Sequence, residues 1–255
     1  MAKDGNKTGT KEWAETTVNC VVGCSHDCRY CYAREMAERY GRVRRGLWQF
    51  EKPDFVRVHR KYGKKKGRIM FPSAHDITPA VLPHCLVVLE SMLKAGNDVL
   101  IVSKPHTECI TAICWMFEEF KEKIEFRFTI GSADNDILRF WEPGAPDFAE
   151  RLSCLKHAFD NGFKTSVSCE PYLDAYVVYT YSACLPYLTE SFWVGKLRDF
   201  KRRVDTSGLT QAELEQFDLP LQAVQSDYIV RSIYGLLDGQ RFIKWKDSFR
   251  KVIGI

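Results

Sequence analysis

No run of about eighteen apolar residues occurs in the sequence, and this absence excludes a membrane-spanning helix. The first residues, MAKDGNKTGTKEW, include no apolar segment of the length that a secretory signal needs. Neither an internal repeat nor a low-complexity tract is present, which excludes solenoid proteins and compositionally biased linkers. The sequence therefore predicts a globular, cytoplasmic protein without a membrane segment.

Cysteine is the abundant residue that calls for an explanation. Ten cysteines without an export signal indicate a reducing compartment, where clustered thiols bind metals or perform chemistry more often than they pair. Apolar residues make up 45% of the 255 residues, so the chain can bury a core without disulfide bonds. This length fits one large domain or two small ones.

Short apolar runs alternate with amphipathic helical patterns along most of the chain. We expect strands at 16–23, 68–73, 98–103, 124–132, 163–171 and 190–197. We expect helices at 32–41, 78–96, 108–123 and 145–162, then a mainly helical remainder with a short strand at RFIKW. Such alternation predicts a parallel sheet, flat or closed into a barrel, with the working residues at the carboxyl ends of its strands.

Three cysteines in the segment CSHDCRYCYA follow the pattern C-x3-C-x2-C, and they are Cys24, Cys28 and Cys31. A structural zinc site needs four closed ligands, and Cys20 or His26 could be the fourth. A four-iron cluster on three cysteines keeps one iron open to a small molecule. Because no distant cysteine pair accompanies the three, we favour the cluster. Cys20 itself is more typical of a buried strand residue.

The cysteine motif and the aromatic residue after it resemble the signature of the radical S-adenosylmethionine (SAM) superfamily. Residues 16–200 further resemble the spore photoproduct lyase-like group, through CYA, PSAHD, VSKPH, EPGAPDFAERL and FWVGKL. The resemblance implies a partial (β/α)6 TIM-like barrel over 16–200. We expect a flexible N-terminal tail at 1–15 and a short, mainly helical C-terminal extension at 201–255, packed on the core.

The resemblance also implies a cofactor set. Cys24, Cys28 and Cys31 match the ligands of a [4Fe-4S] cluster, which cleaves SAM reductively to a 5′-deoxyadenosyl radical that abstracts a hydrogen atom from the substrate. An electron donor such as flavodoxin or ferredoxin is implied as a partner. Many family members have Gly-Gly-Glu at the turn after the second strand, and this triplet binds the methionine amino group of SAM. The triplet is absent here, so we expect backbone carbonyls, Ser73 or Asp76 to bind the amino group. The residues assigned to cofactor binding are Tyr30, Tyr32, Ser73, Lys104 and Ser132.

Four further residues stand at expected strand ends and are our candidates for catalysis on the substrate side. His75 and Asp76 follow the second strand, and Cys169 and Glu170 end the fifth. The characterised relative in this group repairs a thymine dimer photoproduct and has a hydrogen-donating cysteine beside the serine of its second strand. In this sequence neither neighbour of Ser73 is a cysteine, so Cys169 is the candidate for the hydrogen-donating cysteine.

Positive charge is concentrated in one part of the chain. The formal charge is +4, but residues 34–68 include thirteen Lys or Arg and four Asp or Glu. The densest part, RVHRKYGKKKGR at 57–68, indicates either a phosphate-binding segment near the rim of the site or a solvated loop. We expect a nucleic acid or nucleotide substrate that contacts 57–68. The sequence indicates no oligomeric state.

Two alternatives to this function stay open. The first is a radical SAM enzyme that modifies a peptide or a small molecule; peptide-modifying members often have further cysteine-bound clusters, but no cysteine follows Cys184. The second is a non-catalytic, zinc-binding module that binds nucleic acid.

Overall fold

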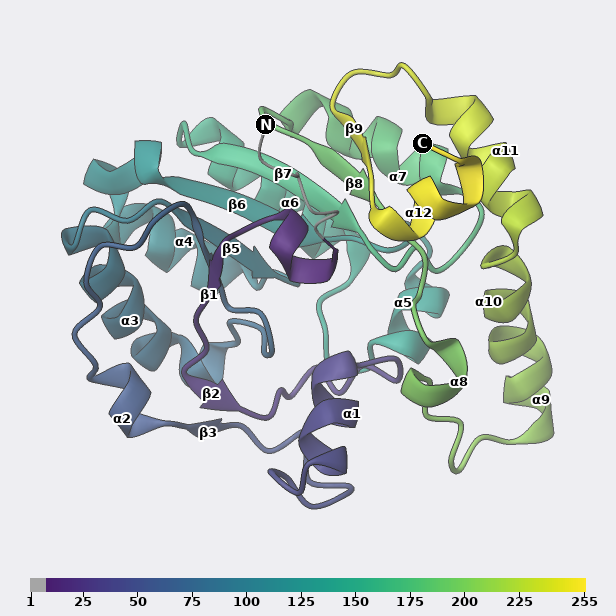
Figure 1. Ribbon diagram of the computed structural model, residues 1–255, viewed down its shortest axis with the longest axis horizontal. Coiled ribbons are helices and arrows are strands. Elements are labelled where there is room, and N and C mark those ends of the chain that lie inside the picture. The colour runs from purple at the N-terminus through teal and green to yellow at the C-terminus, as the bar shows by residue number, and fades with distance from the viewer. Residues whose placement is uncertain (1–7) are drawn as a thin grey trace, which may run out of the picture.

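The computed structural model describes residues 8–255, which form one parallel sheet with helices around it (Figure 1). Seven strands pair in the order β1-β4-β5-β6-β7-β8-β9, every neighbour in parallel. Their bounds are β1 Thr16–Thr17, β4 Ile69–Phe71, β5 Val99–Ser103, β6 Ile124–Thr129, β7 Lys164–Cys169, β8 Phe192–Val194 and β9 Ile243–Trp245. The expected fold class, a partial TIM-like barrel, is confirmed. A short antiparallel pair, β2 Val21–Val22 with β3 Lys52–Pro53, stands outside this sheet.

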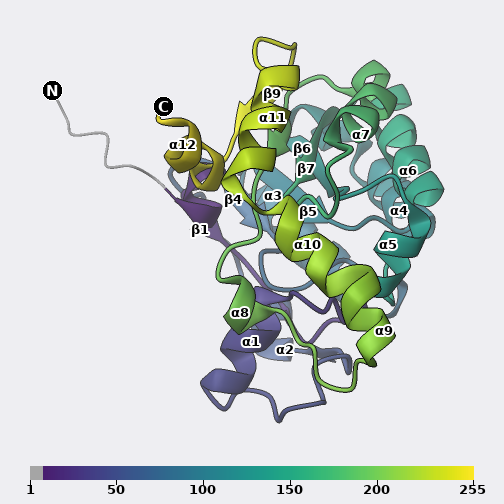
Figure 2. The same cartoon turned by 90° about the vertical axis from the view of Figure 1, so that its right-hand side faces the viewer.

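Helices follow most of the strands. The α-helices are α1 Tyr32–Arg39, α2 Phe55–Val58, α3 Leu82–Lys94, α4 Thr107–Met116, α5 Asn135–Trp141, α6 Phe148–Asp160, α7 Val177–Cys184, α8 Phe200–Arg203, α9 Gln211–Glu213, α10 Leu219–Val224, α11 Asp227–Leu237 and α12 Asp247–Ile253. Short 3-10 or π segments are η1 Gly9–Glu12, η2 Pro79–Val81, η3 Glu118–Lys123, η4 Leu185–Tyr187 and η5 Leu214–Asp218. Helices α4, α6 and α7 cover one face of the sheet, and α12 lies on the other side (Figure 2). Every helix among residues 8–255 is too short or too polar to cross a bilayer.

The two faces of the sheet have different contents because side chains alternate along a strand. On β6, Phe126 and Phe128 join the core under the helices. Glu125 and Arg127 point to the opposite face, where their side chains lie 2.7 Å apart and the guanidinium of Arg127 stacks over Trp13. This second face is the inner face of the partial barrel.

The N-terminal tail prediction is corrected for residues 8–15, and residues 1–7 of it lie outside the described residues. Trp13 and Ala14 are buried, and η1 packs against the C-terminal part of the chain. Lys246 Nζ donates to the carbonyl of Gly9 at 2.8 Å and lies 3.0 Å from the carboxylate of Glu12. Burial of an indole and a buried ion pair therefore hold this segment in place.

Two other expectations about elements change. The strand expected at 16–23 is divided, because the chain leaves the sheet at Asn19 and β2 pairs with β3 instead. The C-terminal extension is mainly helical, but its strand β9 joins the sheet beside β8, so the extension is part of the barrel wall. Helix α5 was not expected, although Asp134 caps it by accepting from the backbone N–H of Asp136 and Ile137.

Candidate functional site

The three cysteines of the motif lie on a loop between β2 and α1. Gly23 begins this loop with φ +95°, and the backbone N–H of Cys24 donates to the carbonyl of Trp48 at 2.9 Å. Cys31 is the N-cap of α1, and its sulfur accepts from the backbone N–H of Arg34 at 3.4 Å. The loop is thus fixed at both ends, by a turn that favours glycine and by a helix start.

A cavity of about 490 Å³ opens beside this loop, at the carboxyl ends of the strands. All three cysteines of the motif line it. Of the other residues expected in the site, the cavity lining includes Tyr30, Tyr32, Ser73, His75, Asp76, Lys104 and Glu170. The structure therefore brings together residues as distant in the sequence as Cys24 and Glu170, as expected for the carboxyl edge of a parallel sheet.

The three thiols lie in a water-poor environment. Burial raises the pKa of Cys24, Cys28 and Cys31 above the ordinary thiol range, and for Cys24 the neighbouring carboxylate of Asp76 adds to the effect. Such thiols keep their protons unless a metal displaces them. The loop is therefore suited to metal binding rather than to a free nucleophilic thiolate.

The donor set fits a [4Fe-4S] cluster with one open iron. Cys20 does not line the cavity, since its sulfur lies against the sulfur of Cys85 at 3.9 Å. His26 has both ring nitrogens in hydrogen bonds, to Asp76 at 2.7 Å and to His106 at 2.8 Å. Among residues 8–255, three cysteines and no fourth therefore line the cavity, which is the ligand count of a cluster that leaves one iron free.

A buried ion pair stands next to the thiols. Lys104 Nζ lies 3.6 Å from Asp76 Oδ2, and the backbone N–H of Lys104 donates to the other carboxylate oxygen at 3.0 Å. Burial opposes ionisation of Asp76, but Lys104 and His26 outweigh it and lower the pKa of Asp76. Burial likewise opposes the ammonium of Lys104, but the ionised carboxylate of Asp76 raises its pKa. Both groups are therefore charged at neutral pH.

A second buried carboxylate, that of Glu142, lies close to the ammonium of Lys104. Glu142 is 1% exposed, lies 4.0 Å from Lys104 Nζ and 2.5 Å from Arg151 Nη2, and accepts from the hydroxyl of Tyr30. Burial opposes its ionisation, yet Arg151 and Lys104 lower the pKa of Glu142. Lys104 Nζ also lies 5.9 Å from the centre of the Tyr30 ring. These contacts fix the cation and the aromatic ring in one orientation.

The turn after β4 is held by a residue that no sequence pattern had selected. The side-chain carbonyl of Asn19 accepts from the backbone N–H of Ser73 and of Ala74 at 2.8 Å each, and its amide donates to the Ser73 hydroxyl at 2.9 Å. The hydroxyl of Tyr32 donates to the carbonyl of Ser73. Arg203, from α8, lies over the Tyr32 ring at 5.6 Å and lines the cavity. The turn is thus preorganised.

Two of the expected substrate-side residues lie around the cavity in different ways. Glu170 is 3.4 Å from Lys246 Nζ, and burial raises its pKa, although Lys246 opposes this. His75 is buried and tied into the turn, because its Nε2 accepts from the backbone N–H of Cys20 at 3.2 Å. Glu170 is therefore the freer candidate for a contact with substrate.

Two expected site residues do not reach the cavity. Cys169 is fully buried in the core under the helices, with its sulfur 3.9 Å from the carbonyl of Gly131. Because side chains alternate along β7, the neighbour Ser168 lines the cavity in its place. Ser132 is also fully buried, and its hydroxyl donates to Asp174 and accepts from the backbone N–H of Asp134. Cys169 therefore cannot present its thiol to this cavity, and Ser132 fixes a turn.

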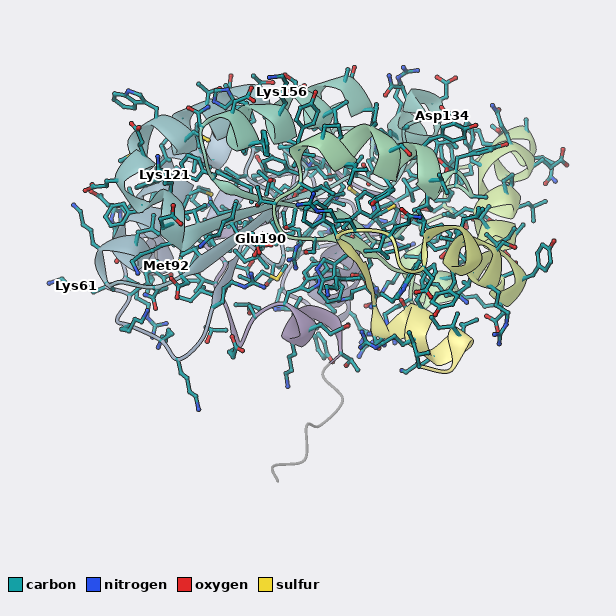
Figure 3. The ribbon with its side chains drawn as sticks, turned by 90° about the horizontal axis from the view of Figure 1, so that it is seen from above. Lys61, Met92, Lys121, Asp134, Lys156 and Glu190 are labelled. Carbon is teal, nitrogen blue, oxygen red and sulfur yellow. The ribbon has the colours of Figure 1, made fainter. Side chains whose placement is uncertain are left out.

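The basic segment 57–68 is not at the rim of the cavity, which corrects that expectation. None of its residues lines the cavity. It packs against the turn before β5: the backbone N–H of Lys65 donates to Asn97 at 2.7 Å, and Asn97 donates to the carbonyl of Gly63. In Figure 3, Lys61 lies at the same end of the molecule as Lys121, which precedes β6, whereas Asp134, which follows β6, lies at the other end. The segment runs along α3, where the backbone N–H of Tyr62 donates to Ser91, and it reaches the amino end of the strands at Lys64 and Lys65.

No model of a known protein family matches the sequence. Two curated relatives bear the name of uncharacterised proteins. One, from Acidianus two-tailed virus, is 28% identical in an alignment of 171 positions that covers 62% of this chain and 55% of that protein. The other, from Methanocaldococcus jannaschii, is 25% identical over 161 residues, 62% of this chain and 60% of that protein. The chain thus matches less than two thirds of the length of either relative.

Solved structures share the fold at low sequence identity. A cysteine-to-alanine mutant of spore photoproduct lyase, with dinucleoside spore photoproduct, has a TM-score of 0.57 at 15% identity, over 96% of this chain and 80% of that one. Streptococcus suis SuiB bound to precursor peptide SuiA has a TM-score of 0.54 at 10% identity, over 94% of this chain and 50% of that one. The resemblance to the spore photoproduct lyase-like group is therefore confirmed at the level of the fold.

Proposed function

We propose that the chain is a radical SAM enzyme of the spore photoproduct lyase-like group. The proposal depends mainly on the composition of the cavity. Among residues 8–255, three cysteines and no fourth line it, and the buried cation of Lys104 lies beside them. The [4Fe-4S] cluster supplies one-electron cleavage of SAM when bound, and the resulting 5′-deoxyadenosyl radical abstracts a hydrogen atom from the substrate. The fold shared with spore photoproduct lyase supports this assignment.

The chain's own residues have distinct roles in the proposal. Cys24, Cys28 and Cys31 hold the cluster. Lys104 binds the carboxylate of the SAM methionine, because a buried ammonium is a strong and orienting partner for an anion. The rings of Tyr30 and Tyr32 lie beside the cofactor, and their hydroxyls are anchored away from it by hydrogen bonds to Glu142 and to the turn after β4.

Metal analysis of anaerobically reconstituted protein tests the cofactor class. We expect about four iron and four sulfide ions per chain, and formation of 5′-deoxyadenosine from SAM after addition of dithionite. Colourless protein with neither iron nor acid-labile sulfide would contradict the proposal. One zinc per chain without iron would instead favour the zinc-binding module, for which Cys24, His26 and Asp76 offer ligand atoms within 4.8 Å of one another.

The substrate that we propose is a nucleic acid or nucleotide, held at the cavity rather than by 57–68. The cavity lining includes four partly or fully exposed cations, which are Lys11, Lys196, Arg198 and Arg203. The inner wall is apolar at Trp13, Met70 and Val102, and such a surface suits a nucleobase. A peptide or small molecule remains the alternative, and the fold of SuiB, solved with a precursor peptide, keeps the peptide version open.

The salt dependence of oligonucleotide binding tests this substrate class. Removal of one cation that binds a phosphate should reduce the slope of log K against log salt by roughly 1. We expect the double variant Lys11→Gln/Lys196→Gln to lower the slope by about 2, whereas Lys61→Gln/Lys66→Gln, with the same change in charge at the other end of the strands, should not change it. Equal slopes for wild type and the Lys11/Lys196 variant would contradict a nucleic acid as the substrate and favour a peptide.

A further inference from the structure

The segment between α1 and β3 forms the outer wall of the cysteine loop. The backbone N–H of Cys24 donates to the carbonyl of Trp48, and that of Ser25 donates to Glu51 at 3.1 Å. A Cβ atom on Gly23 would lie 2.4 Å from the carbonyl oxygen of Phe50, so the two backbones are in direct contact. In Figure 1 this segment lies at the bottom, below α1 and β3 and outside the sheet. Its outer surface is thus one layer of chain away from the cysteine loop.

This outer surface contains a shallow hollow in which exposed apolar side chains lie among cations. We call it the basic hollow; it is lined by Val22, Arg42, Val43, Arg44, Leu47, Phe50, Glu51 and Lys52. The side chains of Leu47 and Phe50 are exposed, at 45% and 65%. The three cations are exposed and form no ion pair with any residue in 8–255. The single acid, Glu51, is already engaged, because it accepts from Ser25 and from Thr78.

We propose that the basic hollow is the docking site of the protein that reduces the cluster, an acidic one-electron carrier of the flavodoxin or ferredoxin kind. The inference rests on the proposed function. One electron leaves the reduced carrier, which is oxidised by one electron, and enters the cluster; no bond forms or breaks. Cations without an ion-pair partner around an apolar centre match an acidic partner in charge and in the usual make-up of an interface.

Position distinguishes this hollow from the other basic surfaces. The rate of electron transfer falls steeply with distance, so a donor must dock close to the metal, and the hollow backs directly on the loop of Cys24. The hollow and the cavity have no lining residue in common, so a donor there leaves the substrate cavity free. The segment 57–68 has more charge, but it runs along α3 and ends at the amino end of the strands, where Lys65 packs against Asn97.

Charge reversal in the reconstituted holoprotein tests the proposal. The variant Arg42→Glu/Arg44→Glu/Lys52→Glu alters the hollow, and the control Arg60→Glu/Lys61→Glu/Lys66→Glu makes the same change in net charge in the distant segment. We measure the second-order rate of cluster reduction by a reduced acidic flavodoxin, the reduction by dithionite, and the dissociation constant of the oxidised flavodoxin by calorimetry. Dithionite reports on the cluster alone, because a small reductant needs no docking surface.

We expect the hollow variant to lose at least tenfold in rate with flavodoxin and at least tenfold in affinity, because steering by charge is worth roughly 10- to 1,000-fold. Its reduction by dithionite should stay within twofold of wild type, and the control should stay within threefold in every assay. Equal losses in both variants, or none in the hollow variant, would overturn the docking site while dithionite still reduces the cluster. Loss of oligonucleotide binding in the hollow variant with an unchanged flavodoxin rate would assign the hollow to nucleic acid. If dithionite reduces nothing in wild type, the proposed function itself fails, and the docking site fails with it.

Discussion

Replacement of Lys104 by methionine separates the role of its charge from the role of its stem. Methionine keeps the apolar stem but removes the ammonium, which lies 3.6 Å from Asp76 and 4.0 Å from Glu142. Removal of one partner of a buried ion pair costs about 3–5 kcal/mol when the other charge is stranded. Neither carboxylate is stranded here, because Asp76 keeps His26 and Glu142 keeps Arg151. We therefore expect a smaller loss of unfolding free energy, roughly 1–3 kcal/mol.

The same variant should bind SAM much more weakly. A hydrogen bond to a charged group contributes about 1.5–3 kcal/mol, which corresponds to a roughly 10- to 150-fold rise in Kd. Lys196→Met is the matched control, because Lys196 also lines the cavity but pairs with the exposed Asp227 at 3.0 Å. Calorimetric titration of SAM into reconstituted protein measures the Kd of both variants, and chemical denaturation measures their stability. A folded Lys104→Met protein whose Kd for SAM is within threefold of wild type would refute the carboxylate contact.

Three further predictions concern the cluster loop and the rim. Cys28→Ala should abolish iron retention, whereas Cys20→Ala should keep it; loss of iron in the Cys20 variant would mean that the wrong thiols were assigned. Gly23→Ala combines φ +95° with a contact of 2.4 Å to a carbonyl oxygen, so it should lower the unfolding free energy by at least about 2 kcal/mol. Gly41→Ala, also at positive φ but with nothing within 4 Å, should cost less, and equal losses would contradict the packing argument. Burial raises the pKa of Glu170, so ionisation of this carboxyl group destabilises the folded state as the pH rises above the pKa of an unfolded glutamate. We therefore expect Glu170→Gln to raise Tm relative to wild type at pH 8 but not at pH 4. A change in Tm that is the same at both pH values would be inconsistent with this pKa.

The sequence predicted most of the sheet and the cysteine loop because both depend on local patterns. Alternating strands and helices determine a parallel sheet, and three closely spaced thiols must lie near one another whatever the rest of the chain does. The register of β7 was not predictable to one residue, and a shift of one residue exchanges the two faces of a strand. Ser168 therefore lines the cavity, and Cys169, selected for its thiol, packs under the helices.

Long-range charge pairs lie beyond such patterns. A pair between Glu142 and Arg151 at a helix end is suggested by the sequence, and the structure contains it, but nothing in the sequence indicates that the carboxylate is also buried against Lys104. The contact of Asn19 with the turn at Ser73 is likewise a consequence of the fold alone. The contacts with Lys104 and with Ser73 were missed because burial, rather than residue type, makes these groups part of the site.

The location of the basic segment could have been derived from topology. A residue that directly precedes a parallel strand lies at the amino edge of the sheet, and the last part of the basic segment, residues 64–68, directly precedes β4. Closeness in sequence to the cysteine loop is no guide, because the chain crosses from the carboxyl edge to the amino edge between the loop and β4.

The cysteine loop has two accessible sides, and the distribution of charge gives each a different task. Its inner side faces the cavity, where the cation nearest the thiols, Lys104, is neutralised by the buried acids Asp76 and Glu142. Its outer side carries the basic hollow, where three cations have no ion-pair partner among residues 8–255. A buried and paired cation orients a ligand, whereas exposed cations without a counter-charge attract a partner over a distance. Under the proposed function, the electron therefore enters from the outer side, where exposed cations attract the donor protein. The hydrogen atom is abstracted on the inner side, where the paired cation of Lys104 orients the cofactor.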